Sequence, residues 1–356
     1  MFKKLRGFCC FWVFCLFFAF SSSQGADTIL TGAGATFPYP LYEKWIEVYR
    51  GETGVRVDYQ AVGSGSGIRK LLDRKVDFGG TDAFLSQNEL SKADGEILHI
   101  PTCLGAVTVI YHLPGNPVLK FTPDLIADIF LGNCSNWSDE RISAVNPGVR
   151  FPDMAISVVH RSDGSGTTFI FTDYLSKTDS RWQKQVGRGK KVRWPAGMGV
   201  EGNPRVAEFV KKIPGSIGYV ELSYANRHHL PVALIRNKSG RFVAPALEAV
   251  SRAADVALPT DTRILITDTP SPEGYPISAF TWLIFYKEQF YNGRNRDKAL
   301  QLGRFLWWTL HEGQKYNRKL LYAPLPKGAI ANAEAIVRCM RYQGEPLMEM
   351  LFGGSE

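Results

Sequence analysis

Three short segments of this chain share one order: an apolar run typical of a strand, then glycine with serine or threonine, then a helical pattern. They are residues 31–38 (TGAGATFP), 63–67 (GSGSG) and 161–168 (RSDGSGTT). Strand, turn and helix in this order form the repeating unit of α/β folds, in which helices cover a mostly parallel sheet. The repeated unit therefore predicts α/β lobes with largely parallel sheets.

The rest of the chain continues this alternation. Leu41, Trp45 and Tyr49 recur at four-residue spacing, which predicts a helix, and similar helical patterns occur near residues 68–72 and 305–310. The proline-rich segment 259–276 is expected to be a loop that returns the chain from one lobe to the other. Apolar, β-branched runs predict strands at residues 56–59, 107–111, 156–160, 217–220 and 279–286.

The three turns also predict an anion-binding site, because each ends where a helix is expected to begin. A helix N-terminus presents free N–H groups and roughly half a positive charge, so three convergent termini would supply about +1.5 of partial charge. Glycine lets the backbone approach a ligand closely. The guanidinium of Arg161, which opens the third turn, can bind two oxygens at once.

Other interpretations of these turns are weaker. A single turn of this kind is more typical of an ordinary βα loop with a capped helix, but three such turns in one α/β chain favour a common site. Ser64 and Ser165 directly follow glycines, which does not fit the G-x-S-x-G nucleophile pattern. The residue five after Gly63 is Ile68, so these glycines do not form a G-x-x-x-x-G-K-[ST] phosphate loop. The sequence thus predicts an anion cradle and no enzyme.

The first 25 residues have the layout of a secretory signal peptide. Basic residues between Lys3 and Arg6 precede an apolar run over residues 8–20, and small residues follow near Ser23 and Gly25. The run is shorter than the ~20 residues that a spanning helix needs, which disfavours a permanent anchor. Export with cleavage near Ser23–Gly25 is therefore expected.

Net charge and cysteine and histidine content indicate which ligands, disulfides and metal sites are compatible with the chain. Three of the eight net positive charges lie in the predicted signal peptide, and the remaining excess of about +5 is compatible with an anionic ligand. The absence of long runs of like charge argues against nucleic acid as a partner. After the signal peptide the cysteines are Cys103, Cys134 and Cys339, and an oxidising compartment would permit one disulfide, with Cys103 and Cys134 as the candidate pair. His228 and His229 are expected to be a solvated pair, so no metal site is predicted.

The three turns and three further segments resemble the phosphate-binding proteins of bacterial phosphate-specific ABC transporters. The matches follow the family's order and cover essentially the whole chain after the signal peptide. Departures are small: Ala61 stands where the family commonly has glycine, and residues 197–204 are only loosely similar to their counterpart. The matching segments are residues 30–38, 59–67, 76–83, 161–167, 213–221 and 322–326.

This resemblance implies a type II periplasmic binding protein, with two α/β lobes, two crossovers between them and the ligand in the interlobe cleft. Lobe I is expected to comprise residues 26–104 and 277–356, and lobe II with the crossovers residues 105–276. The implied partners are inorganic phosphate and an ABC permease with its ATPase, through which alone the protein meets the membrane. A periplasmic monomer without a cofactor is expected.

The resemblance also assigns ligand residues one by one. Asp163 matches a residue that holds Arg161 in place without contacting the ligand. The residues expected to bind phosphate are Thr36, Phe37, Ser64 and Asp82 from lobe I, and Arg161, Ser165, Gly166 and Thr167 from lobe II.

Asp82 indicates which anion is bound. By itself an aspartate before Ala-Phe-Leu-Ser is typical of a helix cap or turn, but in the family this position is an acceptor facing the ligand. Phosphate at neutral pH keeps a proton that a carboxylate can accept, whereas sulfate has none. A site built to accept an O–H rejects an analogue without one by roughly 10⁴- to 10⁵-fold. Phosphate is therefore predicted, and a sulfate or molybdate binder and a secreted phosphatase are the alternatives; exclusion of arsenate stays open.

Overall fold

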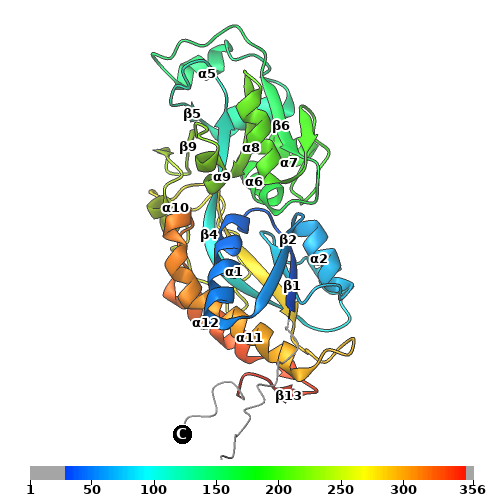
Figure 1. Cartoon of the computed structure of the whole chain (residues 1–356). Coiled ribbons are helices and arrows are strands. Elements are labelled where there is room, and N and C mark those ends of the chain that lie inside the picture. The colour runs from blue at the N-terminus through cyan, green and yellow to red at the C-terminus, as the bar shows by residue number, and fades with distance from the viewer. Residues whose placement is uncertain (1–28, 350–356) are drawn as a thin grey trace, which may run out of the picture.

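The computed structural model describes residues 29–349, and one eight-stranded sheet runs through both lobes of this part of the chain (Figure 1). The strand order is β2-β1-β3-β11-β4-β8-β6-β7. The predicted signal peptide lies outside the described residues. The strands of this sheet are β1 (Ile29–Gly34), β2 (Arg56–Ala61), β3 (Phe78–Thr81), β4 (Ile97–Tyr111), β6 (Ser157–Arg161), β7 (Met198–Val200), β8 (Ser216–Glu221) and β11 (Ser278–Tyr286).

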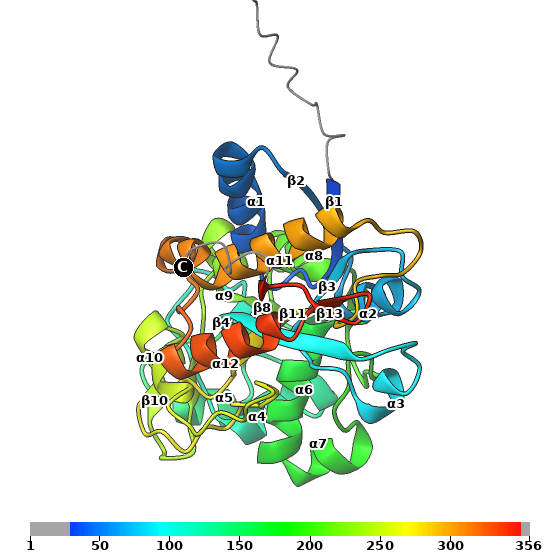
Figure 2. The ribbon, with the colours of Figure 1, turned by 90° about the horizontal axis from the view of Figure 1, so that it is seen from below.

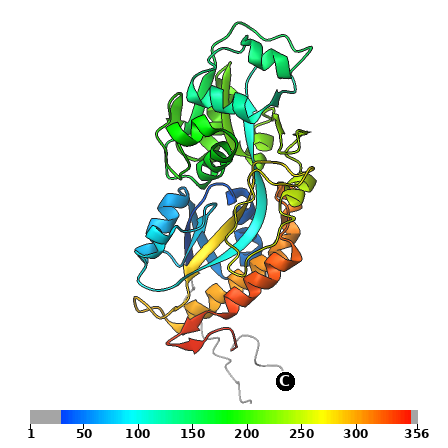
Figure 3. The ribbon, with the colours of Figure 1, turned by 180° about the vertical axis from the view of Figure 1, so that it is seen from behind.

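The long strand β4 belongs to both lobes (Figure 3). It pairs with β11 from Ile97 to Ala106 and with β8 from Val107 to Tyr111. Fourteen of its fifteen residues are buried, as expected for a strand covered on both faces. The two-lobed α/β fold is thus confirmed. The predicted lobe boundaries stay a prediction, and they lie close to this change of partner and to the start of β11 at Ser278.

The sheet is mixed, so the expectation of largely parallel pairing is only partly met. β1 is parallel to β2 and β3 in lobe I, and β6 is parallel to β7 and β8 in lobe II. The central strands β11 and β4 are antiparallel to their neighbours. These are the strands on which the chain passes between the lobes, so no βαβ crossover sets their direction.

Helices cover the sheet in both lobes. In lobe I, α11 and α12 lie together across one end of the molecule (Figure 2). The lobe I helices are α1 (Tyr39–Thr53), α2 (Ser64–Leu72), α3 (Gln87–Leu90), α11 (Arg296–Leu310) and α12 (Lys327–Arg338). Between β4 and β11 the helices are α4 (Pro123–Leu131), α5 (Glu140–Val145), α6 (Gly166–Thr178), α7 (Ser180–Gln185), α8 (Gly202–Lys212), α9 (Leu222–Arg227) and α10 (Leu247–Ala253).

Local sequence signals fix where these helices begin and end. The side chain of Thr122 accepts a hydrogen bond from the backbone N–H of Leu125, Pro123 occupies the first turn of α4, and Gly132 ends the helix in the left-handed conformation. Gly54 ends α1 in the same way. Such caps satisfy the backbone groups that a helix end leaves unpaired.

Short elements complete the fold. Two smaller sheets occur, and residues 259–276 contain neither helix nor strand, as expected for the return crossover. The remaining elements are β5 (Lys120–Phe121), β9 (Leu234–Arg236) and β10 (Phe242–Val243) in one sheet, β12 (Arg341–Tyr342) and β13 (Glu345–Pro346) in the other, and the 3₁₀ helices η1 (Glu312–Tyr316) and η2 (Arg318–Leu320).

The cysteine pairing considered from the sequence is wrong. Cys103, Cys134 and Cys339 are all free thiols. Cys103 and Cys134 are both buried, but Cys103 lies in the part of β4 that pairs with β11, whereas Cys134 follows α4 in lobe II. Within residues 29–349, no helix is long and apolar enough to cross a membrane.

Candidate functional site

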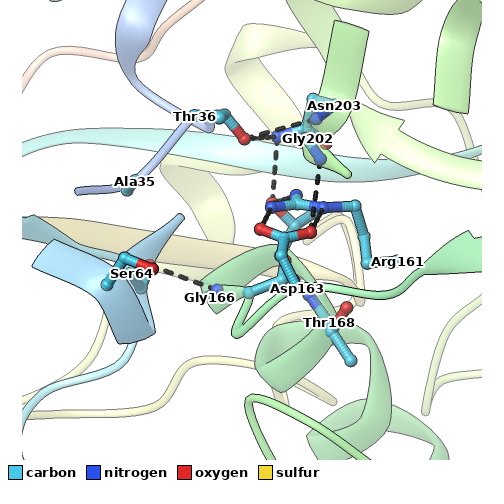
Figure 4. Close-up of polar contacts among 12 residues, drawn as sticks. Ala35, Thr36, Ser64, Arg161, Asp163, Gly166, Thr168, Gly202 and Asn203 are labelled. Carbon is cyan, nitrogen blue, oxygen red and sulfur yellow. Dashed lines mark hydrogen bonds and ion pairs between the residues drawn. The ribbon is translucent and has the colours of Figure 1, made fainter. Parts of the chain in front are cut away.

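The N-termini of four helices meet where the two lobes touch (Figure 4). Thr36 and Phe37 lie just before Pro38, the N-cap of α1. Ser64 is the first residue of α2, and Gly166 is the first residue of α6. Helix α8 begins beside them at Gly202. The Gly/Ser turns predicted to form one site are therefore brought together, although they come from distant parts of the chain.

Ser64 links α2 to α6 across the interface. Its hydroxyl oxygen accepts hydrogen bonds from the backbone N–H of Gly166 at 3.1 Å and of Asp82 at 3.3 Å. A Cβ atom on Gly166 would lie 2.4 Å from a carboxylate oxygen of Asp82 and 2.5 Å from the Ser64 hydroxyl. Gly166 must therefore be glycine for α6 to approach this closely.

The start of α6 is also tied to its own lobe. The Ser165 hydroxyl caps the helix by accepting from the backbone N–H of Thr168 at 3.0 Å. The backbone N–H of Ser165 donates to the carbonyl oxygen of Lys190 at 2.8 Å. Ser165 is fully buried, and its hydroxyl keeps one hydrogen to donate.

Asp82 follows β3 and is 1% exposed. One carboxylate oxygen accepts from the Thr281 hydroxyl at 2.8 Å. Burial raises the pKa of Asp82 to about 7, although the Thr281 hydrogen bond and the charge of Arg161 act in the opposite direction. Asp82 is thus a buried carboxyl group that lies among hydrogen-bond donors.

Arg161, at the end of β6, is held by Asp163. The Nε of Arg161 donates to one oxygen of Asp163 at 2.6 Å, and a terminal guanidinium nitrogen pairs with the other oxygen. Burial raises the pKa of Asp163, but the hydrogen bond and charge of Arg161 outweigh burial and hold it below its usual range. The backbone N–H of Gly202 also donates to Asp163, at 3.2 Å. The role of Asp163 in positioning Arg161 for a ligand, which the resemblance implies, stays a prediction.

Thr36 and Phe37 are fixed by tyrosines from elsewhere in the fold. The carbonyl oxygen of Thr36 accepts from the Tyr224 hydroxyl, and that of Phe37 accepts from the Tyr322 hydroxyl, both at 2.6 Å. The Phe37 ring is fully buried and packs over Gly105, where a Cβ atom would lie 2.6 Å from the ring. These contacts set the backbone of the first turn.

Asn203 is a site residue that the sequence did not reveal. Its side-chain amide donates to the Thr36 hydroxyl at 2.9 Å and to the Thr167 hydroxyl at 3.0 Å. It lies in the segment that resembles the family only loosely. A Gly-Asn-Pro start to a helical pattern is the only local signal there, and it does not show that the amide reaches two predicted ligand residues.

Further contacts hold the lobes together around these residues. The backbone N–H of Gly65 donates to the carbonyl oxygen of Gly164 at 2.8 Å, and Lys190 forms an ion pair with Glu89 at 2.8 Å. Residues of both lobes, among them Thr36, line a cavity of about 570 Å³ at this interface.

The arrangement can bind an anion that carries a proton. Hydroxyl groups, helix N-termini and one guanidinium supply donors, and Asp82 supplies an acceptor. Within residues 29–349, histidine, cysteine and acidic side chains form no group of three or more that could hold a metal ion. All eight predicted ligand residues lie at or beside this interface, and their roles as ligands stay predictions.

Comparison with known proteins places the chain among binding proteins. The model of the PBP superfamily domain matches residues 21–307. The chain is 39% identical over 322 residues to the phosphate-binding protein PstS of Xylella fastidiosa (strain 9a5c), covering 88% of this chain and 86% of that protein. It is 38% identical over 325 residues to PstS of Pasteurella multocida (strain Pm70), covering 90% and 92%.

Solved structures agree in fold. A high-affinity periplasmic phosphate-binding protein, PfluDING, bound with phosphate, superimposes with a TM-score of 0.70 at 22% identity over 86% of this chain and 93% of that one. The phosphate-binding protein of Stenotrophomonas maltophilia gives a TM-score of 0.67 at 20% identity, covering 87% and 94%.

Proposed function

This chain belongs to the PBP superfamily and to the family of phosphate-binding proteins named PstS, and from that membership we propose that it captures inorganic phosphate in the interlobe cleft and delivers it to the permease of an ABC importer. The relatives are named as binding proteins. That naming supports a role in which phosphate is bound and released unchanged, without catalysis.

One observation carries this proposal: the buried Asp82 carboxyl stands among donors that select an anion. Its side chain is in contact range of Ser64 and of the N-terminus of α6, and Arg161 is close enough to influence its pKa. A carboxylate beside a bound anion is unfavourable unless the anion brings a proton for it to accept. Monohydrogen phosphate meets that requirement.

The proposed ligand set is the one that the family resemblance implies, and the arrangement of the turns supports it. In lobe I, backbone and side-chain donors are supplied by the turns before α1 and α2, and Asp82 accepts the phosphate O–H. In lobe II, Arg161 would supply the full positive charge, and the first turn of α6 would supply further donors. The proposed phosphate ligands are Thr36, Phe37, Ser64, Asp82, Arg161, Ser165, Gly166 and Thr167, with Asp163 holding Arg161.

Closure of the lobes is part of the proposal. Lobe I, residues 26–104 with 277–356, binds the anion first, and lobe II, residues 105–276, then brings Arg161 and α6 over it. Closure excludes water and strengthens each charge-assisted hydrogen bond. The protein would act as a periplasmic monomer, exported by its signal peptide, and would meet the membrane only through the permease and its ATPase.

Calorimetry at pH 7 tests the identity of the anion. Phosphate should bind tightly and sulfate should be rejected, because sulfate leaves the Asp82 carboxylate without a proton to accept. Asp82→Asn should narrow this discrimination, since the amide can donate to either anion. Asp255→Asn, at an exposed carboxyl, is the matched control and should leave both affinities unchanged. Equal binding of sulfate and phosphate by the wild type would favour the general oxyanion binder instead.

An enzymatic role is tested separately. The pure protein should not release p-nitrophenol from p-nitrophenyl phosphate, because neither glycine-serine turn presents an activated nucleophile. Sustained turnover that is lost with the Ser64→Ala variant would support the phosphatase alternative.

A further inference from the structure

Asn203 joins the lobes through the hydroxyl groups of two proposed ligands. It is fully buried near the start of α8, and its amide nitrogen lies 2.9 Å from the Thr36 hydroxyl of lobe I (Figure 4). The same nitrogen lies 3.0 Å from the Thr167 hydroxyl of lobe II. Its backbone N–H also donates to the Thr36 hydroxyl, at 3.3 Å. Gly202, at φ +76°, allows the backbone turn that places Asn203 here.

The orientation of the Asn203 amide is fixed from its other side. Its oxygen accepts the backbone N–H of Glu221 at 3.4 Å. Rotating the amide by half a turn would set its NH₂ group against this N–H, two donors facing each other. The amide therefore presents two hydrogens, and no acceptor, to the two threonines.

Both threonine hydroxyls already accept two hydrogen bonds. The Thr36 oxygen accepts from the backbone and side chain of Asn203. The Thr167 oxygen accepts from Asn203 and, at 3.5 Å, from Arg161. A hydroxyl has two lone pairs and one hydrogen, so each can only donate any further bond. Among the hydrogen bonds of residues 29–349, neither hydroxyl donates to a protein group.

We propose that Asn203 is a positioning residue that fixes the Thr36 and Thr167 hydroxyls as donors to the bound anion. This inference rests on the proposed phosphate-binding function and goes beyond it. A protonated phosphate oxygen cannot face these two threonines, because it would find no acceptor there. The phosphate O–H must turn to Asp82, so Asn203 and Asp82 together fix how the anion sits in the cleft.

A double-mutant cycle in phosphate affinity tests this role. Asn203→Ala should weaken binding by about 10- to 100-fold in the wild type, because the two hydroxyls lose the partner that orients them. In a chain that carries Thr36→Val and Thr167→Val, the same change should cost less than about 3-fold, since no hydroxyl remains to orient.

A second variant reverses the polarity of the side chain without changing its shape. Asn203→Asp presents only acceptors, so the two hydroxyls donate to the carboxylate instead of the anion. We expect weaker binding than in Asn203→Ala. Asn146→Ala is the matched control, because it removes another buried amide, bonded to the backbone of Lys120, away from the cleft. It should lower the melting temperature and leave phosphate affinity unchanged.

The outcomes separate this inference from the proposed function. Equal losses from Asn203→Ala with and without the threonine hydroxyls would overturn the inference alone, as would wild-type affinity in Asn203→Asp. A wild-type chain that binds neither phosphate nor sulfate would overturn the proposed function and the inference together.

Discussion

Glu221, at the end of β8, is a fully buried carboxyl beside the site. One of its oxygens accepts from the backbone N–H of Ser223 at 2.8 Å and from the Tyr322 hydroxyl at 3.0 Å. The other oxygen has no hydrogen-bond partner among the described residues. Burial, with a smaller contribution from the charge of Asp82, raises the pKa of Glu221 to about 8. The fold therefore favours the uncharged form.

This pKa predicts how stability depends on pH. The folded pKa of about 8 exceeds the ordinary value of 4.5, so the stabilising contribution is complete below pH 4.5 and is lost as pH rises toward 8. Each unit of displacement corresponds to ~1.4 kcal/mol, so the loss is on the order of a few kcal/mol. Glu221→Gln should flatten the decline in melting temperature of the ligand-free protein between pH 5 and pH 8.

The exposed Glu273 offers a control, since Glu273→Gln should keep the wild-type pH profile. An unchanged profile in Glu221→Gln would show that the carboxyl does not titrate in this range. Asp82, whose pKa is raised to about 7, also contributes to the decline, so some slope remains in the variant.

Residue-level roles were only partly predictable from sequence. The Arg161–Asp163 pair could be foreseen because the family resemblance implies it for a motif that contains both residues. Asn203 could not, because its role depends on two hydroxyls that are 167 and 36 positions away in the chain. Nothing local distinguishes an amide that bridges two lobes from one on a helix surface.

At the scale of elements, the first turn of α6 approaches lobe I more closely than any side chain at position 166 allows. Gly166→Ala should therefore prevent α6 from closing on Ser64 and Asp82. Overpacking of this kind costs about 1–3 kcal/mol, so phosphate affinity should fall about 10- to 100-fold, as calorimetry can measure. Folding should persist, because alanine is the better helix former.

Gly51→Ala in α1 is the control for this prediction. No atom lies within 4 Å of a Cβ at that position, so the variant should bind phosphate like the wild type. Wild-type affinity in Gly166→Ala would mean that α6 does not meet lobe I as described.

Helices and strands whose apolar residues follow a regular pattern were predicted correctly, whereas a strand without such a pattern was missed. The five predicted strands and the helical patterns at residues 41–49, 68–72 and 305–310 all occur. β3 (Phe78–Thr81) was missed because its two glycines carry no strand preference, and tertiary pairing with β1 and β11 decides its conformation. The antiparallel centre of the sheet follows from chain connectivity, which local pattern does not reveal.

At the scale of the whole molecule, an ion pair between Lys190 and Glu89 joins the lobes outside the ligand site. The two side chains are 19% and 21% exposed, so solvent screens the pair in part. The side chain of Glu89 is held in place at the N-terminus of α3, where it forms a capping box with Ser86. The pair favours contact between the lobes without touching the proposed ligand.

Lys190→Met should therefore weaken phosphate binding by about 2- to 5-fold, in line with the ~0.5–1 kcal/mol of a partly exposed ion pair. The loss of affinity should arise from faster phosphate release, which stopped flow can measure. The difference in release rate between Lys190→Met and the wild type should become smaller as the salt concentration is raised. Lys44→Met removes an ion pair with Glu47 within α1 and should leave release unchanged. Identical phosphate release rates in Lys190→Met and the wild type would show that the Lys190–Glu89 ion pair does not stabilise the closed lobes.

The single strand β4 has a consequence for how the molecule loses its structure. The first ten residues of β4 pair with β11 in lobe I, and its last five pair with β8 in lobe II. If either lobe unfolded alone, it would expose a strand edge of the other lobe that is buried in the folded protein. The two lobes are therefore expected to unfold together. Unfolding by denaturant should therefore occur in one cooperative transition. A fragment that ends within residues 97–111 should not fold on its own.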